Sequence, residues 1–117
     1  MRVAFRADAS VDIGAGHVMR CLALADALAA RGAECQFLCR ELPGHLFERI
    51  EARKFAVIHL PISGAADAAL SGPVDDAAEF LAALPGPVDV VVVDHYALGA
   101  EWEKIVSGHC RQLITID

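Results

Sequence analysis

The chain has 117 residues, which is enough for one domain, and its composition excludes several classes of protein. Hydrophobic residues make up 56% of it, yet no apolar run approaches the ~18 residues that a membrane-spanning helix needs. The formal net charge of −6 argues against non-specific binding to nucleic acid, which needs a basic surface. Because Met1-Arg2 leads directly into an apolar segment, there is no room for a signal peptide, and we expect a cytoplasmic protein.

The predicted elements alternate between strand and helix along the whole chain. The apolar segments read as strands are 3–6, 35–39, 55–60, 88–94 and 112–116. The helices that alternate with them are 16–31, a segment beginning at Pro43, a segment from Pro73 to Leu84, and 100–107. A polar loop at 7–16 and a loop of small residues at 62–72 join two of these pairs. The unbroken valines of 90–93 are typical of a central parallel strand that is covered on both faces.

This alternation predicts right-handed βαβ units and therefore an α/β fold with a parallel sheet. We predict the strand order 3-2-1-4-5, which is that of a doubly wound, Rossmann-like sheet. The first and fourth strands then become neighbours at the switch point, where ligands bind beyond the carboxyl ends of the strands. The loop from Asp8 to His17 would face the segment 94–96 there, and two polar clusters that are distant in sequence would share one crevice.

The last segment, 114–117, has the composition of a buried strand end, but no helix follows it to cover that strand. We therefore expect the chain to be part of a longer protein. Apolar surface on the last strand and around the loop 7–16 would then be exposed, and we expect it to favour self-association.

The cysteines and histidines show no metal-binding pattern. Cys35 and Cys39 would share one face of a strand, and the four cysteines contain no C-x-x-C pair, so we interpret them as buried free thiols. The sequence contains no H-x-x-x-H or H-E-x-x-H spacing. We therefore predict neither a metal site nor a cofactor. Three other histidines are expected to be structural or at the surface: His45, His59 and His109.

The most informative stretch is the segment 13–20, IGAGHVMR, where the first strand gives way to the first helix. Gly14 and Gly16 let the backbone turn tightly and bring N–H groups close to a ligand. His17 follows in the first helical turn, where free N–H groups and the positive end of the helix dipole favour the neutral imidazole. Such a ring can act as a base near neutral pH, although it could also make only a local hydrogen bond. With the glycines and the switch-point position, we favour a catalytic role for His17 and hence an enzyme.

Arg20 lies one helical turn after His17, on the same side of the predicted helix. It could pair with Asp8 or Asp12 and so shape the loop, or it could contact a substrate directly. A dinucleotide fingerprint is not complete here, because Met19 stands where a third Gly or Ala is needed. A phosphate-binding loop ending in Gly-Lys-Ser/Thr is also absent.

Several segments of the chain resemble a known family. The segments 5–10, FRADAS, and 13–25, IGAGHVMRCLALA, resemble the N-terminal signature of the UDP-sugar hydrolases of the pseudaminic-acid pathway. The segment 93–96, VDHY, resembles a second motif of that family, and the final Ile116-Asp117 resembles the start of its Asp-Asp segment. The resemblance covers essentially the whole chain but only about the first half of a family member.

The resemblance implies that residues 1–117 form the N-terminal domain of a two-domain, glycosyltransferase-like architecture of the GT-B type, and that a separate C-terminal domain binds UDP. It implies hydrolysis of UDP-2,4-diacetamido-2,4,6-trideoxy-β-L-altropyranose without a metal, by attack of water on the anomeric carbon with inversion. His17 matches the proposed general base of the family. The positions matching the sugar side of its cleft are Asp8, Gly14, Gly16 and Tyr96. From their predicted location we add Arg20 and His95 as substrate-binding candidates, although His95 and Tyr96 could also form an ordinary turn.

Two other functions stay open from the sequence. A glycosyltransferase on the same fold would use an acceptor hydroxyl in place of water, and a non-catalytic module would only bind a nucleotide or a sugar. Since the inferred UDP-binding half lies elsewhere, we expect these 117 residues to be inactive alone.

Overall fold

The computed structural model describes residues 1–62 and 72–116. In this part of the chain, five parallel strands form one sheet in the order β3-β2-β1-β4-β5. The strands are β1 (Arg2–Ala7), β2 (Glu34–Arg40), β3 (Ala56–Leu60), β4 (Val90–Asp94) and β5 (Gln112–Thr115). The protein therefore has the α/β, Rossmann-like doubly wound fold that the sequence predicts, with the predicted strand order.

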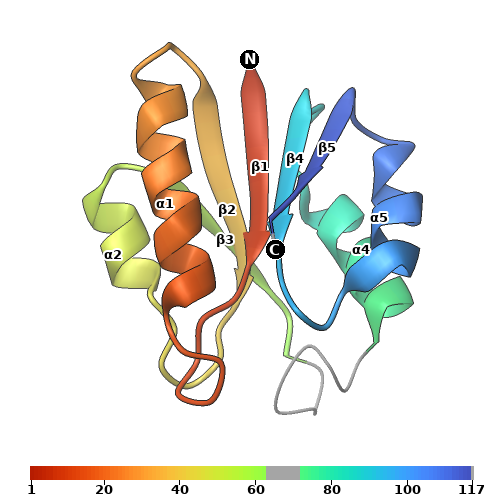
Figure 1. Ribbon diagram of the computed structural model, residues 1–117, viewed down its shortest axis with the longest axis horizontal. Helices are drawn as coiled ribbons and strands as arrows, with labels where there is room; N and C mark the ends of the chain where they lie inside the picture. The colour runs from red at the N-terminus through yellow and green to blue at the C-terminus, as the bar shows by residue number, and fades with distance from the viewer. Residues whose placement is uncertain (63–71, 117) are drawn as a thin grey trace.

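Helices cover the two faces of the sheet (Figure 1). The helices on one face are α1 (Gly16–Ala29) and α2 (Phe47–Ala52), and those on the other are α4 (Pro73–Ala83) and α5 (Gly99–Ser107). Successive side chains of a strand point to opposite faces, so each strand feeds two separate cores. Phe5 packs in the core beneath α1 and α2, whereas Ala4 packs in the core beneath α4 and α5, together with Phe80 and Trp102. All five residues of β4 are buried, as expected for a central strand.

The helix expected from Pro43 starts later than predicted, at Phe47. Gly44 has φ +91°, in the left-handed region, which is incompatible with a right-handed helix. The N–H of His45 instead donates to the carbonyl of Leu42 and closes a turn. The fourth strand is also shorter than predicted and begins at Val90 rather than at position 88. The expected loop of small residues lies mainly outside the described residues.

The last strand, β5, forms one edge of the sheet, and its side chains are more exposed than those of β4. Ile114 is 37% exposed, in agreement with the predicted apolar surface on this strand.

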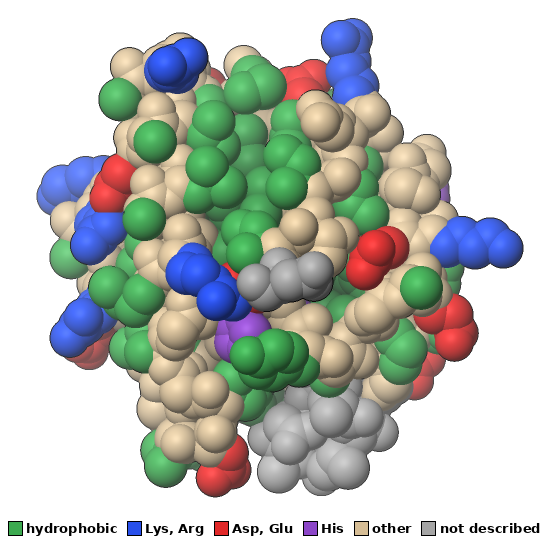
Figure 2. All heavy atoms as spheres, viewed as in Figure 1, with side chains coloured by type: hydrophobic (Ala, Val, Ile, Leu, Met, Phe, Trp, Pro, Cys, Tyr) green, Lys and Arg blue, Asp and Glu red, His purple; other side chains and the backbone are tan. Residues whose placement is uncertain are grey.

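Figure 2 shows hydrophobic side chains gathered over the central strands beside α1, just above a histidine and a basic side chain. Within the described residues, no helix is long and apolar enough to cross a membrane.

The turn at Gly44 also holds the loop that leads into α1. The N–H of Val11 donates to the carbonyl of Pro43 over 2.8 Å, which ties the two loops together. A Cβ on Gly44 would lie 2.6 Å from the Val11 backbone nitrogen, closer than real Cβ atoms come. This contact therefore requires glycine for two reasons, the positive φ and the space.

We expect Gly44→Ala to destabilise the protein clearly more than Gly32→Ala, as measured by urea unfolding. Gly32 has a similar φ of +92°, but nothing lies within 4 Å of a Cβ placed there. Both variants carry the strain of a left-handed residue, about 1–2 kcal/mol. Only Gly44→Ala adds overpacking, about 1–3 kcal/mol more. Equal losses in the two variants would contradict the close approach of the loops.

Candidate functional site

The site lies at the carboxyl ends of β1 and β4, which are paired up to Ala7 and Asp94. The loop after β1 closes on itself, since the Gly14 N–H donates to the Ser10 carbonyl over 2.8 Å. The Ser10 hydroxyl also accepts a hydrogen bond from the N–H of Ile13. This compact loop delivers the first turn of α1, with His17, to the end of β4.

His17 and Asp94 form the central pair of the site. His17 Nδ1 lies 2.5 Å from Asp94 Oδ1, and His17 is only 5% exposed. The half-exposed Arg20 donates two hydrogen bonds to the same carboxylate, from Nε to Oδ2 over 2.9 Å and from Nη2 to Oδ1 over 2.9 Å. An ionised carboxylate only accepts hydrogen bonds, so the proton of this contact belongs to His17 Nδ1. In the neutral ring the other nitrogen, Nε2, carries the lone pair, and no hydrogen bond from the described residues occupies it.

The charge of Asp94 is maintained by its partners. Burial alone would raise the pKa of its carboxyl, but the hydrogen bonds from Arg20 and His17 outweigh burial and hold that pKa below its usual range. Asp94 is therefore a carboxylate at neutral pH. This fixes the orientation of the His17 ring and would stabilise a positive charge on it.

Of the two roles left open for Arg20, pairing with Asp8 or Asp12 is wrong, because Arg20 pairs with Asp94. The helical turn that separates Arg20 from His17 directs both side chains to the end of β4. Asp8 has other partners on the opposite face of the sheet.

His95 and Asp8 form a second pair of histidine and carboxylate. His95 Nε2 lies 2.8 Å from Asp8 Oδ2, and His95 Nδ1 accepts a hydrogen bond from the Ala97 N–H over 3.1 Å. The ring must therefore carry its proton on Nε2, the reverse of His17. The two rings lie 6.5 Å apart and are nearly parallel, at 15°. Both nitrogens of His95 are used within the protein.

Asp8 is fully buried and both of its oxygens are engaged. Arg6 donates from Nη1 to Oδ1 over 2.7 Å and from Nη2 to Oδ2 over 3.0 Å, and the Arg40 N–H donates to Oδ1 over 2.8 Å. Burial alone would raise the Asp8 pKa, but Arg6 and His95 hold it well below its usual range. In this arrangement Asp8 holds His95, and both of its oxygens are used within the protein.

The sequence reasoning missed the buried ion network that continues from Arg6. Asp76 on α4 binds Arg6 Nε over 3.0 Å and Arg6 Nη2 over 2.6 Å, and it also binds Arg40 Nη2 over 2.8 Å. The indole N–H of Trp102 donates to Asp76 Oδ1 over 2.8 Å. Two signals could have revealed the network: an arginine inside the apolar first strand, and an aspartate four residues before Phe80 on the apolar face of a helix.

The remaining predicted residues surround His17. Tyr96 is 86% exposed, and its ring makes a T-shaped contact with the His17 ring, with ring centroids 4.5 Å apart at 82°. Gly14 has φ +85°, as a tight turn requires, and nothing lies within 4 Å of a Cβ built on either Gly14 or Gly16. The backbone here is open on the side where side chains would stand, and a ligand could approach it closely.

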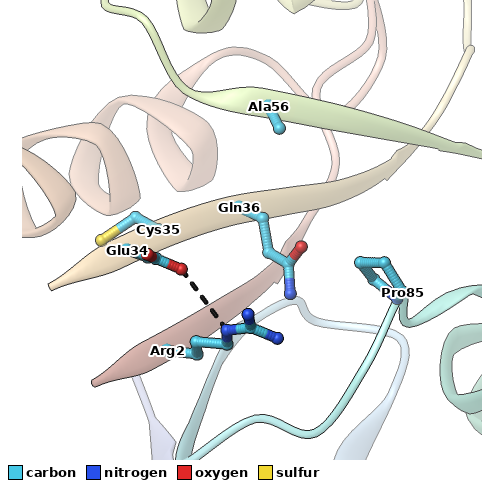
Figure 3. Close-up of a pocket in the computed structure, with 6 residues that line it drawn as sticks. All are labelled: Arg2, Glu34, Cys35, Gln36, Ala56 and Pro85. Atoms are coloured by element: carbon cyan, nitrogen blue, oxygen red, sulfur yellow. Dashed lines mark ion pairs between the residues drawn. The ribbon is translucent and has the colours of Figure 1, made fainter.

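Two hollows are lined by residues that follow the carboxyl ends of the strands. A cavity of about 240 Å³ is lined by Asp94, His95, Tyr96, Gly99, Glu103, Thr115 and Ile116. Another of about 240 Å³ lies between the two loops, lined by Ser10, Val11, Asp12, Ile13, Leu42, Pro43 and Ile62. A larger hollow of about 410 Å³ lies at the amino ends of β1, β2 and β3, beside the Arg2–Glu34 ion pair (Figure 3). Its lining holds no histidine, whereas both histidine–carboxylate pairs lie at the carboxyl ends of β1 and β4.

Comparison with protein-family models gives no match for this chain, and comparison with curated proteins gives none either.

In the part of the chain that the structure describes, no group of three or more His, Cys, Asp or Glu side chains is arranged to hold a metal ion. The free thiols are buried or half-buried, and burial raises the pKa of Cys21 to about 12.

We expect the free energy of unfolding to fall steeply as the pH drops below about 4. Asp8, Asp76 and Asp94 have folded-state pKa values below the ordinary 3.8, because arginine and histidine partners outweigh the effect of burial. Their contribution is complete above the unfolded pKa and is lost as the pH falls through the folded one. Each carboxylate adds up to about 1.4 kcal/mol per pH unit to this slope. Urea unfolding between pH 2 and 7 measures it.

Asp76→Asn should cost about 3–5 kcal/mol at pH 7, since it leaves Arg6 and Arg40 buried with fewer counter-charges, and it should flatten the acid slope. Asp75→Asn is the matched control, because it removes an exposed carboxylate from the same turn of α4 and should stay within about 0.5 kcal/mol of the parent. A similar small loss at both positions would contradict the buried network.

Proposed function

We propose that this chain supplies the catalytic base of a UDP-sugar hydrolase that releases UDP from a UDP-linked diacetamido-trideoxy sugar, in pseudaminic-acid or surface-polysaccharide synthesis. The specific sugar is suggested by the motif resemblance of the segments 5–10, 13–25 and 93–96. A second domain, outside these 117 residues, would bind the UDP part. The protein would therefore be active only with both domains present.

The observation that carries the proposal is the bond between His17 Nδ1 and Asp94. It uses Nδ1 and leaves Nε2 without a hydrogen bond from the described residues. A histidine held by a carboxylate at one nitrogen, with the other free, is the arrangement of a general base. The site lies at the switch point between β1 and β4, where doubly wound sheets bind ligands.

In the proposed reaction, His17 Nε2 takes a proton from a water molecule while the water oxygen attacks the anomeric carbon. The bond between that carbon and the oxygen of the β-phosphate breaks, and its electron pair leaves with UDP. The products are the free sugar with inverted configuration, UDP, and a proton on His17 that returns to solvent. Because UDP is a good leaving group, activation of the water contributes more than protonation of the phosphate.

Asp94 and Arg20 have supporting roles in this step. When His17 becomes an imidazolium, the carboxylate 2.5 Å away stabilises its charge. Arg20 keeps that carboxylate ionised and fixed in place. Tyr96, whose ring contacts His17 and is otherwise open to solvent, offers an apolar face to a sugar.

We expect His17→Ala, in the chain together with its UDP-binding domain, to lower kcat by about 10²–10⁴. Affinity for UDP should change little, since His17 lies in the domain proposed to hold the sugar. UDP release and calorimetric UDP binding measure the two effects. His109→Ala, which removes an exposed histidine after α5, is the control and should match the parent. Turnover at the parental rate in His17→Ala would contradict the assignment of His17 as the general base. If the parent protein turns over only with an added acceptor, a transferase is favoured.

EDTA should leave the rate of UDP release unchanged, because the proposed step needs only the base and the leaving group. The assay compares protein treated with EDTA and then resupplied with Mg²⁺ or Mn²⁺. Loss of activity that either ion restores would contradict this mechanism and would favour a metal-dependent transferase.

A further inference from the structure

The turn that follows β4 is set by His95. Its Nδ1 accepts the hydrogen bond of the Ala97 N–H, two residues further along, and so fixes the backbone on both sides of Tyr96. Tyr96 makes a close contact through its ring with His17, yet it is 86% exposed. So exposed a side chain is held mainly by its backbone, and here that backbone depends on His95.

The His95 ring is in turn anchored deep in the protein. Its Nε2–H donates to Asp8, which Arg6 holds with two hydrogen bonds, and Arg6 is held by Asp76 on α4. The side chains of Arg6, Asp8 and Asp76 are completely buried. A charge-paired network of this kind has few alternative arrangements, because any movement would leave a buried charge without its partner.

We propose that His95 is a positioning residue: locked by Asp8 as the Nε2–H tautomer, it sets the 95–97 turn and thereby holds Tyr96 against His17. The ring does not present a free nitrogen to a ligand. This differs from the direct substrate contact expected for His95 from the sequence. It concerns the ligand-free protein and stands or falls independently of the proposed hydrolase function.

The chain carries a probe for each end of this connection. Tyr96 is its only tyrosine and Trp102 its only tryptophan. Cross-relaxation (NOE) between the Tyr96 and His17 rings reports the position of Tyr96, and the indole N–H of Trp102 reports the Asp76 end. The ring ¹⁵N shifts of His95 report its tautomer directly.

In the parent protein we expect His95 to be protonated on Nε2 and bare on Nδ1, and the Tyr96–His17 NOE to be present. His95→Ala should abolish this NOE and leave the Trp102 indole resonance in place. His109→Ala should change nothing.

Three results would overturn the proposal. One is a His95 ring protonated on Nδ1, and another is an unchanged NOE in His95→Ala. The third is joint loss of the NOE and the Trp102 resonance, which would show that His95 supports the whole network rather than Tyr96.

Discussion

The parallel pairing of β1 with β4, which ends at Ala7 and Asp94, is the constraint on which the site depends. It places the residues that follow two strands distant in sequence side by side at one edge of the sheet. Since side chains alternate along a strand, Asp94 points to the α1 face and meets His17. The next residue, His95, meets Asp8, and the Arg6–Asp8 pair extends to α4. Asp94 at the end of β4 thus holds His17 on the α1 face of the sheet, and Asp8 after β1 holds His95 on the opposite face.

The two histidines differ in what their partners leave free. Asp94 uses only Nδ1 of His17, whereas Asp8 and the Ala97 N–H use both nitrogens of His95. The same residue type is therefore available for chemistry at one position and fixed in a structural role at the other. The Asp8 carboxylate that holds His95 is itself fixed by Arg6, whose buried guanidinium needs both Asp8 and Asp76 to compensate its charge.

The sequence was sufficient for the fold because hydrophobic periodicity and glycine and proline positions carry that information. It identified all five strands in the described residues and their order, and the correct start of α1. It placed the start of the second helix wrongly at Pro43, because the left-handed turn at Gly44 goes with a tertiary contact to Val11 that the sequence does not reveal. It singled out His17 and Arg20 but did not foresee that both contact Asp94. Such pairings depend on which face each strand end presents, and Asp76 joins the network only through the packing of α4.

The central claim is that His17 and Asp94 act as one catalytic unit, and a double-mutant cycle tests it most directly. It compares kcat/KM for UDP release in His17→Ala, Asp94→Asn and the double variant, each in the chain joined to the proposed UDP-binding domain. If Asp94 works only by orienting and charging the His17 ring, the double variant should be no worse than His17→Ala alone. If the two losses instead multiply, Asp94 acts independently of His17, and the account of the site is wrong.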